Sequence, residues 1–158
     1  MNIFLSHSVR DVKMIEEISK EFNDKDLDLY IAEQDIQPGS NLLDKIRDAI
    51  KKCDIFVVVI SKNGLRSKWV HSEIGIAIAS NKRIVPIVEE GVDVPPQLSG
   101  TEFIRFDPNE PESALDSLKI FLSKLKASRE SIQLSDTIFV FVVVLLGIIL
   151  IPALFSKK

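Results

Sequence analysis

The feature that most constrains the fold is an apolar run near the middle of the chain, Asp54–Ser61, with the sequence DIFVVVIS. Its β-branched residues follow one another without the apolar–polar alternation of a half-exposed strand. A strand of this kind is buried on both of its faces, as in the centre of a parallel sheet. The run therefore predicts an α/β protein built around a parallel sheet.

Further strand and helix patterns alternate along the chain as far as about residue 128. Apolar runs predict strands at residues 2–6, 27–32, 54–61, 83–88 and 102–107. Between them, amphipathic patterns predict helices that begin near residues 8, 40, 67 and 111. Right-handed crossovers make a flavodoxin-like, doubly wound sheet of five parallel strands the expected topology.

Two local features refine these elements. Ser8 and Asp11 have the spacing of a capping box, in which each side chain satisfies the other's backbone N–H at the start of a helix. Pro86 lies inside a predicted strand, where it removes one hydrogen-bond donor from the ladder. Its strand is therefore expected near an edge of the sheet or with a bulge.

The helix predicted at Ser67–Ser80, SKWVHSEIGIAIAS, carries the candidate chemistry. Ser67 can cap it, and an apolar stripe at helical spacing faces the core. Trp69 and Glu73 are four residues apart and lie beside this stripe, so they are neighbours on the helix surface. Ligands of open α/β sheets bind outside the carboxyl ends of the strands. Glu73 lies near that rim, either as a site residue or as a solvated acid.

Composition limits the classes of function. The chain has 158 residues, a length typical of one ordinary domain, and its formal net charge is −3. No basic patch indicates a nucleic-acid partner. The single Cys53 excludes an internal disulfide framework and has no metal-ligand spacing around it, so we expect a buried thiol and no metal site. We also expect no bound cofactor.

The last part of the chain has the composition of a membrane anchor. Residues 138–155, IFVFVVVLLGIILIPALF, contain no charged residue. As a helix they would extend about 27 Å, close to the roughly 30 Å hydrocarbon core of a bilayer. A buried core helix is the alternative, but such helices are usually amphipathic. We therefore expect a polar linker at 129–137, a single transmembrane helix at 138–155 and a short basic tail at 156–158.

Basic residues on the two sides of this segment predict its orientation. Four of them precede the span and two follow it: Lys119, Lys124, Lys126 and Arg129, then Lys157 and Lys158. The positive-inside rule places the globular domain in the cytoplasm. The beginning of the sequence has no signal-peptide pattern, which favours the same orientation.

Four segments, in order along the chain, resemble the successive motifs of a TIR domain. They are FLSHS at Phe4–Ser8, YIAEQDIQPG at Tyr30–Gly39, FVVVIS at Phe56–Ser61 and SKWVHSE at Ser67–Glu73. KRIVPIV at 82–88 resembles the fourth strand of that family, and the resemblance covers about residues 1–128. Within it, the WxxxE element from Trp69 to Glu73 resembles the catalytic helix of TIR domains that cleave NAD.

The resemblance implies roles for particular residues. It implies that Glu73 is the catalytic acid and that the loop at 33–40 is mobile. The candidates for substrate binding are His7, Ser8, Tyr30, Asp35, Gly39 and Trp69. Tyr30 and Trp69 have packing as an alternative role, and Asp35 and Gly39 have that of ordinary loop residues. Arginines that some family members carry in the first loop are replaced here by His7 and Ser8, with Arg10 as the candidate to compensate.

The chemistry implied for Glu73 needs few groups. The bond from ribose to nicotinamide in NAD joins a cationic base, which leaves neutral without being protonated, unlike the leaving group of an ordinary glycosidase. One ionised carboxylate can stabilise the positive charge that develops on the ribose. Water then gives ADP-ribose, or attack by the adenine gives a cyclic product.

Two classes of function remain open from the sequence. The first is a membrane-anchored NAD hydrolase or cyclase that becomes active on self-association, in defence or cell-death signalling. The second is a non-catalytic adaptor that binds other TIR domains. A phosphorylated receiver domain, which has a similar topology, is excluded because its acceptor aspartate would fall at Ser61.

Overall fold

The computed structural model describes residues 1–21, 28–31 and 41–129. The chain divides into two units, Met1–Leu118 and Lys119–Lys158. Within the described ranges, no helix is long and apolar enough to cross a membrane. The predicted membrane span at 138–155 lies outside these ranges.

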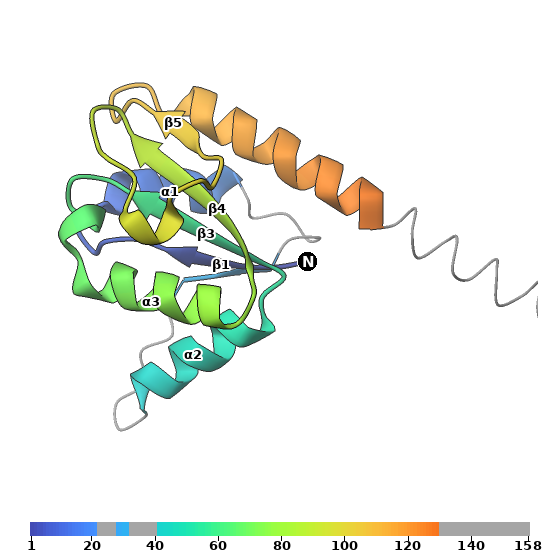
Figure 1. Cartoon of the computed structure of the whole chain (residues 1–158). Helices are drawn as coiled ribbons and strands as arrows, with labels where there is room; N and C mark the ends of the chain where they lie inside the picture. Colours follow the sequence, from blue (N-terminus) through green and yellow to red (C-terminus); the bar gives the residue numbers. More distant parts are fainter. Residues whose placement is uncertain (22–27, 32–40, 130–158) are drawn as a thin grey trace, which may run out of the picture. The chain divides into compact units, whose positions relative to one another are not determined.

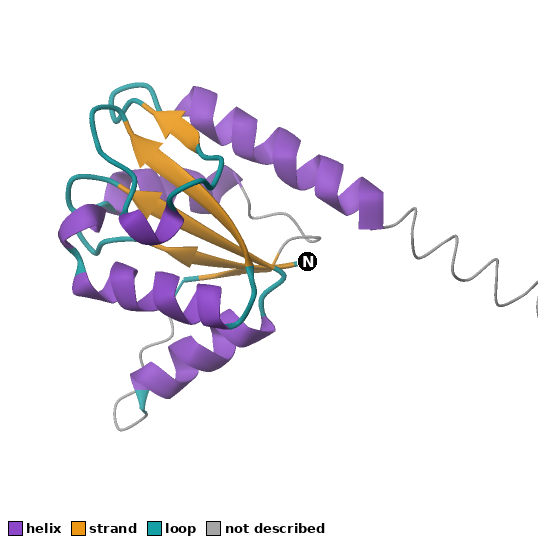
Figure 2. Ribbon diagram, in the orientation of Figure 1, coloured by secondary structure: helices purple, strands orange, loops and turns teal. Residues whose placement is uncertain are grey.

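Five parallel strands form one sheet in the first unit (Figures 1 and 2). They are β1 (Asn2–Ser6), β2 (Asp28–Tyr30), β3 (Ile55–Ile60), β4 (Arg83–Glu89) and β5 (Ile104–Phe106). Their spatial order, β2-β1-β3-β4-β5, is that of a flavodoxin-like fold. The predicted fold class and sheet are therefore confirmed, although β5 is confined to three residues.

Helices cover both faces of this sheet. They are α1 (Val12–Glu21), α2 (Leu42–Lys52) and α3 (Lys68–Ala79), with short 3-10 turns η2 (Gly64–Arg66) and η3 (Pro96–Leu98). The helices α2 and α3 lie side by side on one face, and α1 lies on the other (Figure 1). A further helix spans residues 112–129, in agreement with the amphipathic pattern that predicts a helix near residue 111.

The central strand β3 has the burial that its sequence predicts, because all six of its residues are buried. Successive side chains of a strand point to opposite faces. Phe56, Val58 and Ile60 therefore join the core on the side of α2 and α3, which also contains Ile46, Ile50, Val70, Ile74 and Ala77.

Pro86 lies at a place where β4 has one neighbouring strand. It is opposite Val58 of β3 in the register, whereas the pairing of β4 with β5 begins only at Ile87. The strand is thus locally an edge strand at the proline, as predicted.

The predicted capping box at the start of α1 is wrong. The Ser8 Oγ accepts a hydrogen bond from the Arg10 backbone N–H, at 3.4 Å, and not from that of Asp11. The Asp11 carboxylate instead accepts from the Ser61 hydroxyl at 2.6 Å and from the Asn63 amide at 2.9 Å. Asp11 therefore joins α1 to the loop after β3.

Cys53 is expected to resist alkylation in the folded protein. Its thiol is buried and donates to the Ile50 carbonyl oxygen at 3.1 Å, and this burial raises the pKa of the Cys53 thiol above its usual value. Alkylation requires the thiolate, so labelling by iodoacetamide at pH 8 should be slow in the native protein and complete in guanidinium. Mass spectrometry measures both, and rapid native labelling would contradict this placement.

Candidate active site

The candidate site lies where the order of the strands reverses. After β1 the chain continues to β2 on one side, and after β3 it continues to β4 on the other. In open α/β sheets, ligands bind at this switch point, outside the carboxyl ends of the strands. Four polar residues that end β1 and β3 or directly follow them are buried there: Ser6, His7, Ser8 and Ser61.

The helix α3 brings Glu73 to this edge of the sheet. Ser67 caps the helix, because its side chain accepts from the Val70 backbone N–H at 3.4 Å. The Glu73 side chain is 6% exposed, so it belongs to the buried part of the helix and is not a solvated acid beside the apolar stripe. Glu73 is thus a buried residue of the sheet edge and not the solvated acid that the sequence also allowed.

A hydrogen bond from β1 holds the Glu73 carboxylate. The Ser6 Oγ donates to the Glu73 Oε2 at 2.5 Å, across 67 residues of sequence. A buried carboxylate is costly unless it is hydrogen-bonded, and Ser6 supplies such a bond.

The other residues of the WxxxE element lie in different surroundings. Trp69, one helical turn before Glu73, is 50% exposed, so it does not serve as a core packing residue. His71 is half-buried, and its Nε2 lies 2.8 Å from the Leu65 carbonyl oxygen. His71 therefore ties α3 to the preceding turn η2.

The first-loop candidates lie next to Ser6 in the chain. His7 and Ser8 are both buried, and the Ser8 hydroxyl forms the local turn with Arg10 described above. Arg10 itself is exposed. The structure therefore brings His7 and Ser8 to the edge of the sheet that also carries Glu73.

Tyr30 lies in a row of aromatic rings that crosses the sheet. Its ring stacks on Phe4 at a centroid distance of 5.5 Å, and Phe4 stacks in turn on Phe56, also at 5.5 Å. Phe4 precedes Ser6 by two residues, or about 7 Å along a strand. The tyrosine ring also lines a pocket of about 370 Å³ toward α2, with Lys45 and Asp48. Packing thus accounts for its placement, while Asp35 and Gly39 lie outside the described residues.

A second group of polar residues, which sequence patterns do not reveal, holds the loop after β3. The Ser61 Oγ donates to Asp11 and accepts from the backbone N–H groups of Asn63 and Gly64, at 3.1 and 2.8 Å. These bonds set the turn that leads into α3. A serine shortly before a glycine indicates a turn, but nothing local predicts Asp11 as the partner.

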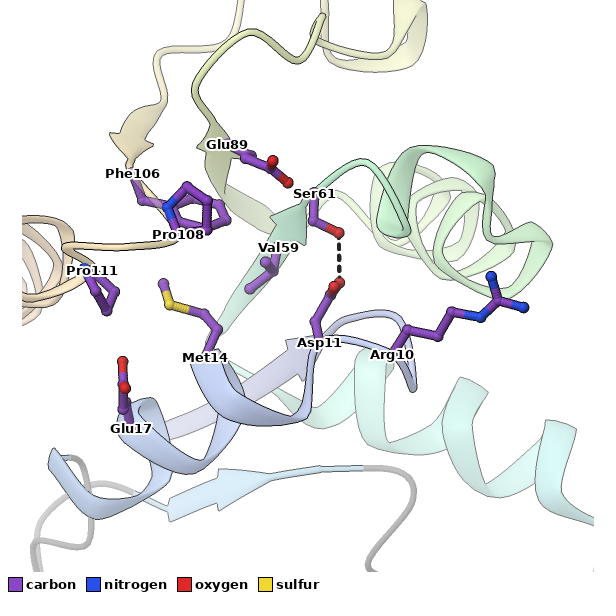
Figure 3. Close-up of a pocket in the computed structure, with 10 residues that line it drawn as sticks. All are labelled: Arg10, Asp11, Met14, Glu17, Val59, Ser61, Glu89, Phe106, Pro108 and Pro111. Carbon is purple, nitrogen blue, oxygen red and sulfur yellow. Dashed lines mark hydrogen bonds between the residues drawn. The ribbon is translucent and has the colours of Figure 1, made fainter.

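A pocket of about 200 Å³ lies on the face of the sheet that α1 covers, opposite to the face that carries α3 and Glu73. It is formed between α1 and the ends of β3, β4 and β5 (Figure 3). Asp11, Met14, Ser61 and Glu89 are among the residues around it. The Glu89 carboxylate accepts from the Lys62 backbone N–H at 3.0 Å and pairs with its Nζ at 3.1 Å. Glu73 lines neither this pocket nor the one beside Tyr30. Among the described residues, no cluster of histidine, cysteine or acidic side chains is arranged to hold a metal ion.

The strand order places this domain among the flavodoxin-like α/β folds, and a buried glutamate, Glu73, lies at the switch point of its sheet. The chain belongs to the TIR family, whose model, described as "TIR domain", matches residues 3–119. A search of curated proteins gives no match.

Solved structures agree with this family. The Clostridium botulinum CMP N-glycosidase BcmB is 23% identical with a TM-score of 0.58, over 75% of this chain and 99% of that one. The TIR domain of the Toll-related receptor TRR-2 from Hydra magnipapillata is 17% identical with a TM-score of 0.63, over 80% and 95%. TIR domains of the activated Roq1 resistosome are 20% identical with a TM-score of 0.52, over 56% and 57%. At these identities the likeness shows a shared fold.

Proposed function

We propose that this protein is an N-glycosidase that cleaves the bond between ribose and nicotinamide in NAD⁺, with Glu73 as the catalytic carboxylate. One observation carries the proposal: a buried glutamate at the switch point of the sheet, held by a hydrogen bond from Ser6. Glutamates are rarely buried to this degree, and this one lies at the edge of the sheet where ligands of such folds bind.

The reaction needs negative charge more than it needs proton transfer. Nicotinamide leaves as a neutral base, and positive charge develops on the ribose. A fixed carboxylate beside the ribose stabilises that charge, most strongly where little water screens it. Water completes hydrolysis to ADP-ribose, or the adenine attacks to give cyclic ADP-ribose.

One of the similar structures points to a second nucleotide that should be tested as a substrate. BcmB is described as a CMP N-glycosidase, so a protein of this fold breaks the bond between a base and ribose in a different nucleotide. Cytosine, unlike nicotinamide in NAD⁺, is an uncharged base that leaves more readily when it is protonated. A single carboxylate suits NAD⁺ better, and CMP is therefore the comparison substrate.

The remaining site residues are assigned by position. His7 and Ser8, at the end of β1, would contact phosphate and ribose, and Trp69, exposed one helical turn from Glu73, would contact the substrate. Asp35 and Gly39 would contribute from the loop after β2. Tyr30 has the weakest support of these candidates, because its ring already packs against Phe4.

Residues 138–155 would anchor the protein in a membrane, with the TIR domain on the cytoplasmic side. Confinement to a surface raises the effective concentration of weakly associating domains. Association at the membrane, with other copies of this chain or with other TIR domains, would then activate the enzyme in defence or cell-death signalling.

The test is to reconstitute the full chain in lipid vesicles at low and at high surface density, and to add NAD⁺ or CMP. Chromatography with mass spectrometry would identify the free base and the sugar product. We expect release of nicotinamide, faster per molecule at high density, and little release of cytosine. Release of cytosine alone would show that CMP, and not NAD⁺, is the substrate. Release of neither base would favour the non-catalytic adaptor. Equal rates per molecule at both densities would overturn activation by clustering.

A further inference from the structure

We infer that Ser6 is a positioning residue, whose hydroxyl holds the Glu73 carboxylate in the orientation that cleavage requires. The inference rests on the proposed function, and it adds a residue to which sequence patterns assign no role. The hydrogen bond from the Ser6 Oγ to the Glu73 Oε2, at 2.5 Å, carries it.

The position of Ser6 in β1 favours a specific role for the hydroxyl over simple packing. Side chains two apart in a strand share a face, so Ser6 follows Phe4 on the side of α2 and α3. Phe4 belongs to the apolar core there, and so does Val58, the residue opposite Ser6 in β3. Ser6 is 1% exposed, so an apolar side chain would be the usual residue at this place.

The strand makes a rigid support for this hydroxyl. Ser6 is the last residue of β1, and its register with Val58 fixes its backbone against the central strand of the sheet. A glutamate side chain has three rotatable bonds and samples many rotamers unless a partner holds it. A donor on the sheet therefore selects one orientation of an acid that a separate element, α3, brings to the edge.

Orientation matters for an acid that acts by its charge. Groups that stabilise a transition state are effective when they are already in place, because no energy is then spent in turning them toward the developing charge. Without the Ser6 bond the carboxylate loses the contact to β1 that fixes its orientation, whereas the groups that bind the rest of the substrate are unchanged. The loss should therefore fall on kcat and leave KM nearly unchanged.

The experiment compares Ser6→Ala, Ser6→Thr and Ser6→Cys with the wild type, as full chains in vesicles, using release of the base as the readout. We expect Ser6→Ala to lower kcat roughly 10- to 100-fold with KM within about twofold. Ser6→Thr, which keeps the hydroxyl, should restore most of kcat. Ser6→Cys, which offers only a weak donor, should resemble Ser6→Ala. Ser72→Ala is the matched control, because its hydroxyl is exposed on α3 and bonds only to the Lys68 carbonyl among the described contacts.

Thermal unfolding of each variant tests whether that variant is folded. If Ser6→Ala does not fold, Ser6→Cys takes its place in the comparison. If Glu73→Ala abolishes release but removal of the Ser6 hydroxyl leaves it unchanged, the proposed function stands and the role of Ser6 is overturned. A fall in kcat that Ser6→Thr does not reverse would also overturn it. Absence of release from the wild type would overturn the proposed function, and the role of Ser6 with it.

Discussion

Replacing Glu73 with glutamine is expected to lower the rate of base release by roughly 10²- to 10³-fold or more, a loss comparable to that of a single electrostatic group in an active site. The amide has the shape of the carboxylate and can still accept the bond from Ser6 that the structure shows. It carries no charge, however, and cannot stabilise positive charge on the ribose. The fold should persist, because the buried position loses a charge and keeps its hydrogen bond.

The measurement is kcat for release of the base, with the thermal unfolding midpoint as a check on folding. Glu16→Gln is the matched control, since Glu16 is an exposed acid on α1. Glu16→Gln makes the same chemical change away from the site, so this variant is expected to keep the wild-type activity. A folded Glu73→Gln protein that keeps more than a tenth of the wild-type rate would refute the assignment of Glu73.

Replacing Gly64 with alanine is expected to lower the free energy of unfolding by about 3 kcal/mol. A Cβ at this position would lie 2.6 Å from the backbone oxygen of Val59 and 3.4 Å from the Ser61 Oγ. The first contact is with main chain in the central strand, which cannot move aside. The turn into α3 would have to shift instead, and with it the hydrogen bond from the Gly64 N–H to Ser61.

The same substitution at Gly75 should have the opposite sign. Gly75 is exposed in α3, and a Cβ built there meets no atom within 4 Å. Alanine is a better helix former than glycine, so Gly75→Ala should raise the free energy of unfolding by about 1 kcal/mol. Denaturant unfolding followed by circular dichroism measures both variants. Equal stability of the two would contradict the close approach at Gly64.

Much of the fold is readable from local patterns. The unbroken apolar run of β3 predicts a strand buried on both faces, and this holds for all six residues. The apolar stripe of α3 and the capping residue Ser67 are likewise local features, and the structure has both. The parallel sheet follows from the alternation of strand and helix patterns along the chain, and the fixed hand of the crossovers limits its topology.

Local patterns fail where side chains from distant segments meet. The spacing of Ser8 and Asp11 suggests a capping box, yet Asp11 bonds to Ser61, 50 residues away. A contact between elements thus replaces the interaction that the neighbours in sequence would favour.

The sequence by itself determined the parallel α/β sheet and the presence of a glutamate on the helix after the third strand. Only the tertiary structure decided that Glu73 is buried and that Ser6 donates a hydrogen bond to it. The physical reason is that the periodicity of a helix tells which residues share a face, but the partner of that face depends on where the helix lies against the sheet. Glu73 meets the end of β1 because α3 packs on that face, which no pattern within either segment contains.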